Sequence, residues 1–305
     1  MSALGGPFGM LSVIVPAHNE EAVIARGLRA IVTGAAPGEI EVIVACNGCT
    51  DGTADLARQF GPPVHVLEIE QASKTAALNA AEELASGFPR FYVDADVVID
   101  LPSIRRMAAV LEAGPVLMAN PELHMDLSRT TWPVRAFYRV WTALPYNRQN
   151  GMVGTGVYAL SRAGRARFEC FPDVIADDGF VRYCFAPYER TCVRGALSRV
   201  APPHGLGALL RIKTRSRLGK YQLRQTCPDR PAADRRSIRL LVRALLRRPH
   251  LWLLLPVYVA VNVCARIRAS RRVRAIQAWH WARDDSRIAS VDASSGGAPL
   301  RNSSS

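Results

Sequence analysis

The chain has 305 residues, of which 49% are hydrophobic. This is enough for one large domain with a buried core and excludes an intrinsically disordered protein. Seven cysteines are too few for the disulfide framework of a small secreted protein. Their number is odd and no signal peptide is expected, so we predict that the protein resides in a reducing compartment. The net charge of +13 is concentrated in residues 205–283, which carry 19 Lys or Arg and 2 Asp or Glu and so indicate an anionic partner, either a membrane or a nucleic acid.

Strands and helices alternate through the first hundred residues. Short apolar, β-branched runs predict buried strands at 11–16, 41–45, 64–67 and 91–93. Helical segments separate these runs, and the most regular of them covers residues 74–85. The alternation predicts an α/β fold with a parallel sheet, in which ligands bind outside the carboxyl ends of the strands.

Polar residues follow three of these strands, and the most distinctive is the pair Asp94 and Asp96. On an extended backbone this spacing places both carboxylates on one face. A hard divalent cation between them would relieve their repulsion and could hold a diphosphate. Taken by itself the pair is equally compatible with an acidic turn that binds no metal.

The second hundred residues continue with mixed elements. We expect a helix at 104–111, a strand at 116–120, an aromatic-rich helix at 132–144 and a Gly-rich turn that leads into a strand ending at 160. A second acidic pair, Asp177 and Asp178, precedes a further helix. Basic residues alternate with others over 211–217, where they either reach a diphosphate or form a solvated face.

Five segments together resemble the family 2 glycosyltransferases, an inverting group with the GT-A fold, which is a Rossmann-like mixed α/β sheet. The segments are Pro16-Ala-His-Asn-Glu-Glu21, Asn47-Gly-Cys-Thr-Asp-Gly-Thr53, Lys74-Thr-Ala-Ala-Leu-Asn79, Asp94-Ala-Asp96 and Asp177-Asp178. The resemblance implies a glycosyltransferase of the hexosyltransferase class, which moves a sugar from a nucleotide-sugar to an acceptor hydroxyl with inversion. It also implies a GT-A domain over 10–225, divided into a nucleotide-binding half at 10–100 and an acceptor half at 101–225.

The resemblance assigns roles to residues of this chain. Asp94 and Asp96 would hold Mg²⁺ or Mn²⁺, with His204 as a candidate third ligand that is otherwise a turn residue. Asp178 would be the general base, with Asp177 as the second choice. The residues expected to contact the donor are Pro16, Ala17, Asn19, Glu20, Asn47, Asp51, Lys74, Asp94 and Arg215.

Two departures from the family pattern limit what the resemblance implies. Asn47 stands where the family usually has an Asp, and an amide both donates and accepts, so the nucleotide base stays open. The Gln-x-x-Arg-Trp signature of processive synthases is absent from the sequence, which favours the transfer of a single sugar.

The basic block predicts contact with a membrane. Residues 235–248 form an amphipathic pattern of arginine and leucine, and residues 251–265 are an apolar run that is shorter than the ~20 residues a membrane span requires. We therefore expect residues 226–287 to attach monotopically to the anionic cytoplasmic face of the cell membrane. The alternative is a single transmembrane helix near 251–268.

For an enzyme at the membrane, we expect the acceptor to be a lipid-linked, glycolipid or polysaccharide precursor. Residues 1–9 and 288–305 are expected to be tails, the second of them disordered.

Two other functions compete with this interpretation. A nucleic-acid-binding protein could use the same basic block, but its arginines alternate with leucine and valine rather than with stacking aromatics, so we expect no nucleic acid partner. A nucleotidyltransferase would share the α/β plan and its metal-binding carboxylates, but it does not account for the second acidic pair.

Overall fold

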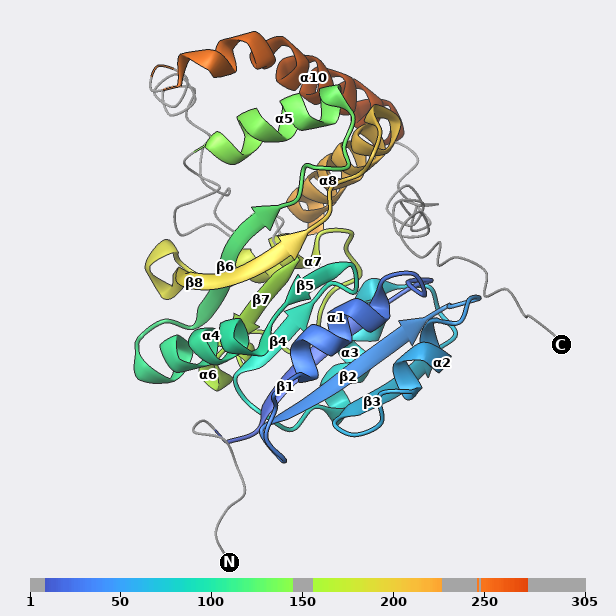
Figure 1. Ribbon diagram of the computed structural model, residues 1–305, viewed down its shortest axis with the longest axis vertical. Coiled ribbons are helices and arrows are strands. Elements are labelled where there is room, and N and C mark those ends of the chain that lie inside the picture. Colours follow the sequence, from blue (N-terminus) through green and yellow to red (C-terminus); the bar gives the residue numbers. More distant parts are fainter. Residues whose placement is uncertain (1–8, 145–155, 227–245, 247, 274–305) are drawn as a thin grey trace, which may run out of the picture.

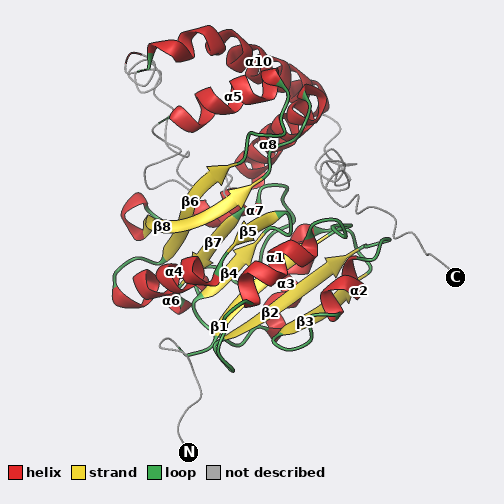
Figure 2. Ribbon diagram, in the orientation of Figure 1, coloured by secondary structure: helices red, strands yellow, loops and turns green. Residues whose placement is uncertain are grey.

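The computed structural model describes residues 9–144, 156–226, 246 and 248–273. An eight-stranded mixed sheet lies at its centre, in the order β3-β2-β1-β4-β7-β6-β8-β5, and helices cover both faces (Figures 1 and 2). The predicted α/β class is therefore confirmed. Residues 1–8, 145–155, 227–245, 247 and 274–305 lie outside the described residues. They include the predicted tail at 288–305, nearly all of the tail at 1–9, and most of the amphipathic pattern at 235–248 and of the Gly-rich turn.

The first half of the sheet is parallel, as the alternation of strands and helices predicts. Its strands are β1 (Leu11–Ala17), β2 (Ile40–Asn47), β3 (Val64–Ile69) and β4 (Arg90–Val93). Val13 of β1 pairs with Val42 on one side and with Phe91 on the other. All four carboxyl ends therefore meet at one edge of the sheet.

The second half of the sheet is mixed. Strand β7 (Val157–Leu160) runs antiparallel to β4, and β6 (Met118–Met125) runs antiparallel to β7. Strand β8 (Arg190–Val200) is parallel to β6, and β5 (Val97–Ile99) closes the edge antiparallel to β8. The sequence patterns do not predict β5 and β8.

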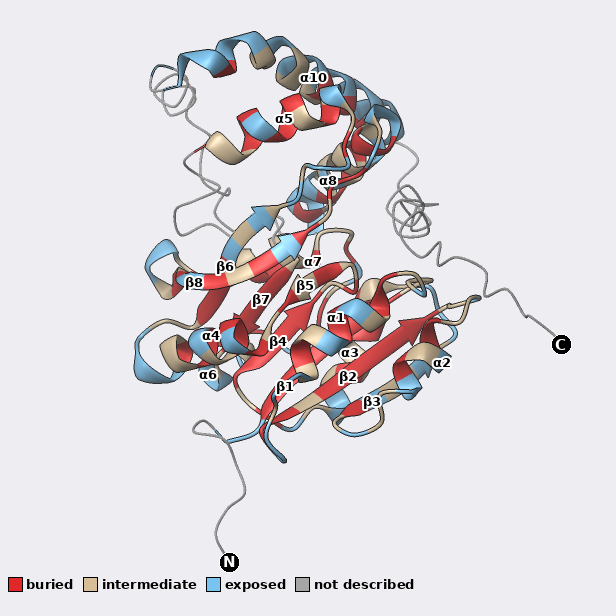
Figure 3. Ribbon diagram, viewed as in Figure 1, coloured by how far each residue is buried: buried red, intermediate tan, exposed pale blue. Residues whose placement is uncertain are grey.

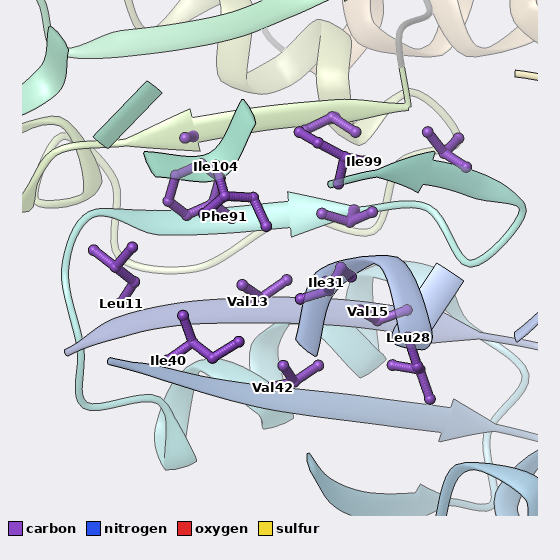
Figure 4. Packing of buried hydrophobic residues seen from close by; sticks show 14 of the residues in the cluster. Leu11, Val13, Val15, Leu28, Ile31, Ile40, Val42, Phe91, Ile99 and Ile104 are labelled. Carbon is purple, nitrogen blue, oxygen red and sulfur yellow. The ribbon is translucent and has the colours of Figure 1, made fainter. Parts of the chain in front are cut away.

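Two cores, one on each face of the sheet, hold the helices in place. On one face, α1 (Ile24–Val32), α2 (Thr53–Arg58) and α4 (Leu101–Ala113) cover the side chains shown in Figure 4. On the other face lie α3 (Lys74–Leu84) and α7 (Asp177–Tyr183). Figure 3 shows the strands buried between these layers. The remaining short helices are α6 (Arg162–Arg165) and η2 (Pro187–Glu189).

Three helices form a separate cluster at one end of the molecule (Figure 1). They are α5 (Trp132–Ala143), α8 (Leu206–Thr226) and α10 (Leu255–Arg272), and η3 (Pro249–Leu254) precedes α10. Phe137 of α5 stacks on Tyr258 of α10 with ring centroids 5.2 Å apart. Among the described residues, one helical segment, Pro249–Arg272, is long and apolar enough to cross a membrane.

Candidate functional site

The ends of β1 and β2 are tied together by Asn47. Its side chain is fully buried, and its Nδ2 donates a hydrogen bond to the Ala17 carbonyl at 2.8 Å. Its Oδ1 is buried and accepts no hydrogen bond from the described residues. The Nδ1 of His18 lies 2.5 Å from the Asn47 carbonyl. Asn47 Oδ1, next to Pro16 and Ala17, can therefore still accept a hydrogen bond.

The two polar segments that follow β1 and β2 fold against each other. Asn19 has a φ of +53°, and its Oδ1 accepts from the Thr50 N–H at 2.7 Å. Asp51 accepts from the N–H groups of Thr53 at 3.1 Å and of Glu21 at 3.2 Å. The Glu20 N–H donates to Thr53 Oγ1 at 2.7 Å. The fold therefore brings the predicted donor-contact residues of these segments together, and it uses the side chains of Asn19 and Asp51 to shape the loop.

The acidic pair Asp94 and Asp96 occupies a turn, and the expected extended backbone is wrong. Strand β4 ends at Val93, and the Val97 N–H donates to the Asp94 carbonyl at 2.9 Å, which closes the turn. The turn forms because Asp is favoured at such positions and because β5 begins directly afterwards. The two carboxylates therefore do not share a strand face, and that argument for a metal between them is lost. The argument that remains is their position at the edge of the sheet where ligands bind.

Gly156, which immediately precedes the neighbouring strand β7, supports this turn. Its carbonyl accepts from the Asp94 N–H at 2.8 Å, and its φ is +63°. A Cβ at this position would lie 2.4 Å from Val97 Cγ2 and 3.2 Å from Asp94 Oδ2. Only glycine fits here without displacing Val97 and crowding Asp94.

Lys74 joins two carboxylates from different elements. It is the first residue of α3, where the Ser73 hydroxyl caps the helix by accepting from the Ala76 N–H. The Lys74 Nζ lies 2.7 Å from Asp94 Oδ1 and 3.0 Å from Asp177 Oδ1. Burial opposes the charge of the ammonium, but Asp177 and Asp94 outweigh burial and raise the pKa of Lys74. One carboxylate of each acidic pair, Asp94 and Asp177, thus joins Lys74 in a single cluster.

The carboxylates of the second acidic pair differ in environment. Asp177 is only 4% exposed, and burial, followed by repulsion from Asp178, raises its pKa, while Lys74 acts in the opposite direction. Asp178 is half-buried, and its Oδ1 accepts from the Gly179 N–H at 2.7 Å. Asp177 is therefore committed to an ion pair, whereas Asp178 is the more accessible of the two carboxylates.

Arg215 reaches the same cluster from α8. Burial lowers the pKa of this guanidinium, and attraction by Asp94, Asp177 and Asp178 works against that effect. The structure therefore brings Arg215 close to both acidic pairs, as expected for a residue that would meet a diphosphate. The sequence does not predict the helix that carries it.

The two other predicted metal ligands are Asp96 and His204. Asp96 is half-buried in the turn after β4. His204 is exposed, and its backbone carbonyl accepts from the Thr131 N–H at 3.0 Å. Within the described ranges, no three His, Cys, Asp or Glu side chains lie close enough together to hold a metal ion. Carboxylate oxygens are ligands that a hard divalent cation prefers, so Asp94 and Asp96 remain candidate metal ligands, and the His204 ligand stays a prediction.

Sequence reasoning missed Tyr158 in β7. It pairs with Tyr92 in the β4–β7 register, and the two rings stack with centroids 4.6 Å apart. The Tyr92 hydroxyl donates to Glu82 at 2.5 Å, whereas the buried Tyr158 hydroxyl has no hydrogen-bond partner among the described residues. Burial, followed by repulsion from Asp177, raises the pKa of Tyr158, so this hydroxyl stays protonated.

Comparison with known families identifies the chain. The family model described as Glycosyl transferase family 2 matches residues 12–171, which covers β1 to β7 and both sides of the acidic turn. The chain is a family 2 glycosyltransferase. It is therefore an enzyme of the transferase class.

Individual relatives of this glycosyltransferase are distant. It is 38% identical over 91 residues to the glycosyltransferase AglE of Haloferax volcanii, a match that spans 28% of this chain and 30% of AglE. Its fold is similar to that of the mannosyltransferase PcManGT of Pyrobaculum calidifontis, solved in complex with GDP-Man and Mn²⁺, with a TM-score of 0.54 and 23% identity over 88% of this chain and 78% of the other. A second similar fold is glucosyl-3-phosphoglycerate synthase of Mycobacterium tuberculosis, with a TM-score of 0.51 and 22% identity over 74% and 82%. The predicted GT-A fold with a C-terminal helix is confirmed.

Proposed function

We propose that this glycosyltransferase moves one sugar from a nucleotide-sugar to an acceptor hydroxyl, with inversion at the anomeric carbon. The observation that carries the proposal is the cluster in which Lys74 bridges Asp94 and Asp177 beside Arg215. It lies at the carboxyl edge of the parallel strands, where α/β sheets bind nucleotides. Two cations and three carboxylates at that edge suit a site for a diphosphate, a metal ion and a departing proton.

The donor would bind with its diphosphate at the acidic turn. Asp94 and Asp96 would hold Mg²⁺ or Mn²⁺, and the cation would stabilise the negative charge of the leaving diphosphate. Lys74 and Arg215 would orient the phosphates by charge-assisted hydrogen bonds. Both similar solved structures contain Mn²⁺, which supports a metal ion in this enzyme. Their nucleotides differ, since one holds GDP-Man and the other holds UDP. The acceptor oxygen of Asn47 Oδ1 is a candidate contact to the nucleotide.

Asp178 would be the general base that accepts the proton of the acceptor hydroxyl. It is more exposed than Asp177, whose carboxylate is occupied by Lys74. Burial raises the pKa of Asp177, and Lys74 opposes that shift. It is the 3.0 Å contact with Lys74 Nζ that favours a structural role for Asp177.

The cytoplasmic membrane surface is the proposed location, with a lipid-linked, glycolipid or polysaccharide precursor as the acceptor. Val259, Val263 and Ile267 form a stripe on α10, and their side chains are 47%, 49% and 48% exposed. The opposite face of α10 packs on α5 and α8, where Arg217 donates to Asn262 Oδ1 at 2.9 Å. A membrane span would break these contacts, so the structure favours monotopic attachment with the stripe in the lipid and the nearby arginines at anionic headgroups.

Release of nucleoside diphosphate tests this function. The full-length protein is incubated with Mn²⁺, membrane extract as the source of acceptor, and separate nucleotide-sugars, including UDP-glucose and GDP-mannose. We expect one donor to release nucleoside diphosphate in a reaction that EDTA and Asp96→Ala both abolish. The exposed Asp55→Ala serves as the control and retains activity. Release of inorganic diphosphate, or full activity in Asp96→Ala, would contradict the proposal.

A further inference from the structure

The segment that leads into the second acidic pair is held by another helix. Helix α7 begins at Asp177, and the N-cap residue before it, Ala176, provides no side-chain cap. Gln222 of α8 bonds the loop just before α7: its Oε1 accepts from the Ile175 N–H at 2.8 Å, and its Nε2 donates to the Asp173 carbonyl at 3.1 Å.

Close packing reinforces these two hydrogen bonds. A Cβ on Gly219 would lie 2.9 Å from the Ala176 Cβ and 3.2 Å from the Ala176 nitrogen. A Cβ on Gly179 would lie 2.7 Å from Leu223 Cδ1. The backbones of α7 and α8 therefore approach through two glycines, which leaves little room for the start of α7 to shift.

The residues involved lie on one face of α8. Arg215, Gly219 and Gln222 are spaced four and three residues apart, so successive turns of the helix present them on the same side. Arg215 reaches the acidic cluster, and Gly219 packs against Ala176, the residue before Asp177. Gln222 bonds the loop that precedes Ala176. One rigid helix thus sets the distance between Arg215 and the acidic pair.

We propose that Gln222 is a positioning residue for Asp177 and Asp178. It fixes the loop at 173–176 so that Asp178 meets the acceptor hydroxyl while Asp177 stays on Lys74. This inference rests on the proposed transfer reaction. A displacement of about 1 Å at the reacting groups can lower the rate by up to about a hundredfold, so the loss of one support two residues away has a measurable effect.

The test compares Gln222→Met with Gln225→Met in the full-length protein. Methionine keeps the length of the side chain and removes both hydrogen bonds, and Gln225 is an exposed residue of the same helix. For Gln222→Met we expect kcat to fall about tenfold while the KM for the nucleotide-sugar stays within about twofold. Gln225→Met should match the unmodified chain in both constants.

Hydrogen exchange provides a readout that does not need activity. In Gln222→Met, the amides of residues 175–180 should exchange faster, while those of α3 and β4 keep their rates. Unchanged exchange and unchanged kcat would overturn the positioning role and leave the transfer reaction intact. A general loss of thermal stability with no selective change in kcat would also overturn it. If the unmodified protein transfers no sugar, the transfer proposal fails, and the exchange result still decides whether Gln222 holds this loop.

Discussion

Lys74 is the residue on which the electrostatics of the site depend. It neutralises Asp177, which is almost completely buried, and contacts Asp94 at the rim of the site. A buried carboxylate that loses its partner is strongly destabilising, because its charge is neither solvated nor paired. The role of Lys74 is therefore structural as well as functional.

Lys74→Met should lower the free energy of unfolding by about 3–5 kcal/mol, measured by urea denaturation. Adding Asp177→Asn should recover part of that loss, because the unpaired charge is gone. The exposed Lys220→Met is the matched control. Equal stability of Lys74→Met and the unmodified chain would contradict the ion pair.

The same variant should depend on pH in a definite direction. Burial raises the folded pKa of Asp177, so the folded state holds this proton more tightly than the unfolded state, whose pKa is about 3.9. The stability of Lys74→Met should therefore fall as pH rises from about 4 through the raised folded pKa. Denaturation at several pH values checks this, and a rise in stability over that range would be inconsistent with a buried, unpaired Asp177.

The stacked tyrosines offer a second comparison at the residue scale. Tyr92→Phe removes a hydrogen bond to buried Glu82 and should lower the free energy of unfolding by about 1.5–3 kcal/mol. Tyr158→Phe removes a hydroxyl that has no partner among the described residues, so it should not lower stability. Thermal denaturation distinguishes the two variants, and an equal loss in both would show that the Tyr158 hydroxyl is satisfied.

Several site residues are predictable from local sequence, because each follows a strand or begins a helix. Lys74, Asp94 and Asp177 are of this kind, and the structure brings all three into contact. The contacts of Tyr158 and Gln222 depend on partners 20 or more residues away, and no local pattern marks them. The backbone of Asp94 to Asp96 is mispredicted because i, i+2 spacing places two side chains on one face only while the strand continues. Here the strand ends before Asp94.

The turn after β4 is the element that presents the predicted metal ligands. It needs Gly156 for two separate reasons, a left-handed φ and a lack of space for a Cβ. Gly61 has a similar φ of +58°, but a Cβ there would meet nothing within 4 Å. Comparing alanine substitutions at the two glycines therefore distinguishes the cost of backbone strain from the cost of steric crowding.

Gly156→Ala should be more destabilising than Gly61→Ala, which carries only a backbone penalty of about 1–2 kcal/mol. It should also weaken the binding of Mn²⁺ with UDP or GDP, because the added Cβ displaces Val97 of the same turn and crowds the Asp94 carboxylate. Denaturation and calorimetry with both variants measure the two effects. If Gly156→Ala binds as the unmodified chain does, the turn does not position the metal ligands.

At the level of elements, the parallel half of the sheet follows from periodicity, but β8 and α8 do not. Helix α8 has no single apolar stripe, because it contacts α7, α5 and α10 at different points along its 21 residues. Strand β8 contains a bulge opposite Pro121 and Glu122 and has a mixed pattern of burial. Elements that face several partners lose the regular alternation on which sequence prediction depends.

The whole molecule has an uneven distribution of charge and of exposed apolar surface. Its excess positive charge lies in residues 205–283, which include α8 and α10, and α10 presents the stripe of Val259, Val263 and Ile267. Positive charge beside an exposed apolar stripe suits an anionic bilayer, because each basic residue near the surface adds about 1 kcal/mol to binding. This arrangement would orient the enzyme with its helical cluster against the lipid.

Replacing Val259, Val263 and Ile267 by Ser should greatly reduce flotation with vesicles that contain phosphatidylserine, with little loss of stability. Leu84→Ser, at an exposed apolar position on α3, is the control and should float normally. Binding of the unmodified chain should weaken with salt and on zwitterionic vesicles. Unchanged flotation of the triple variant would show that α10 does not contact the membrane.

The central claim, sugar transfer with Asp178 as the base, is tested most directly by the kcat of Asp178→Asn. Once the donor is known, this variant should bind it with unchanged affinity in calorimetry, while kcat falls by about 10²–10⁴-fold. Asp177→Asn, measured alongside, should change stability more than it changes donor binding, because it alters the ion pair with Lys74. Wild-type turnover in Asp178→Asn, or a loss of turnover confined to Asp177→Asn, would contradict the account.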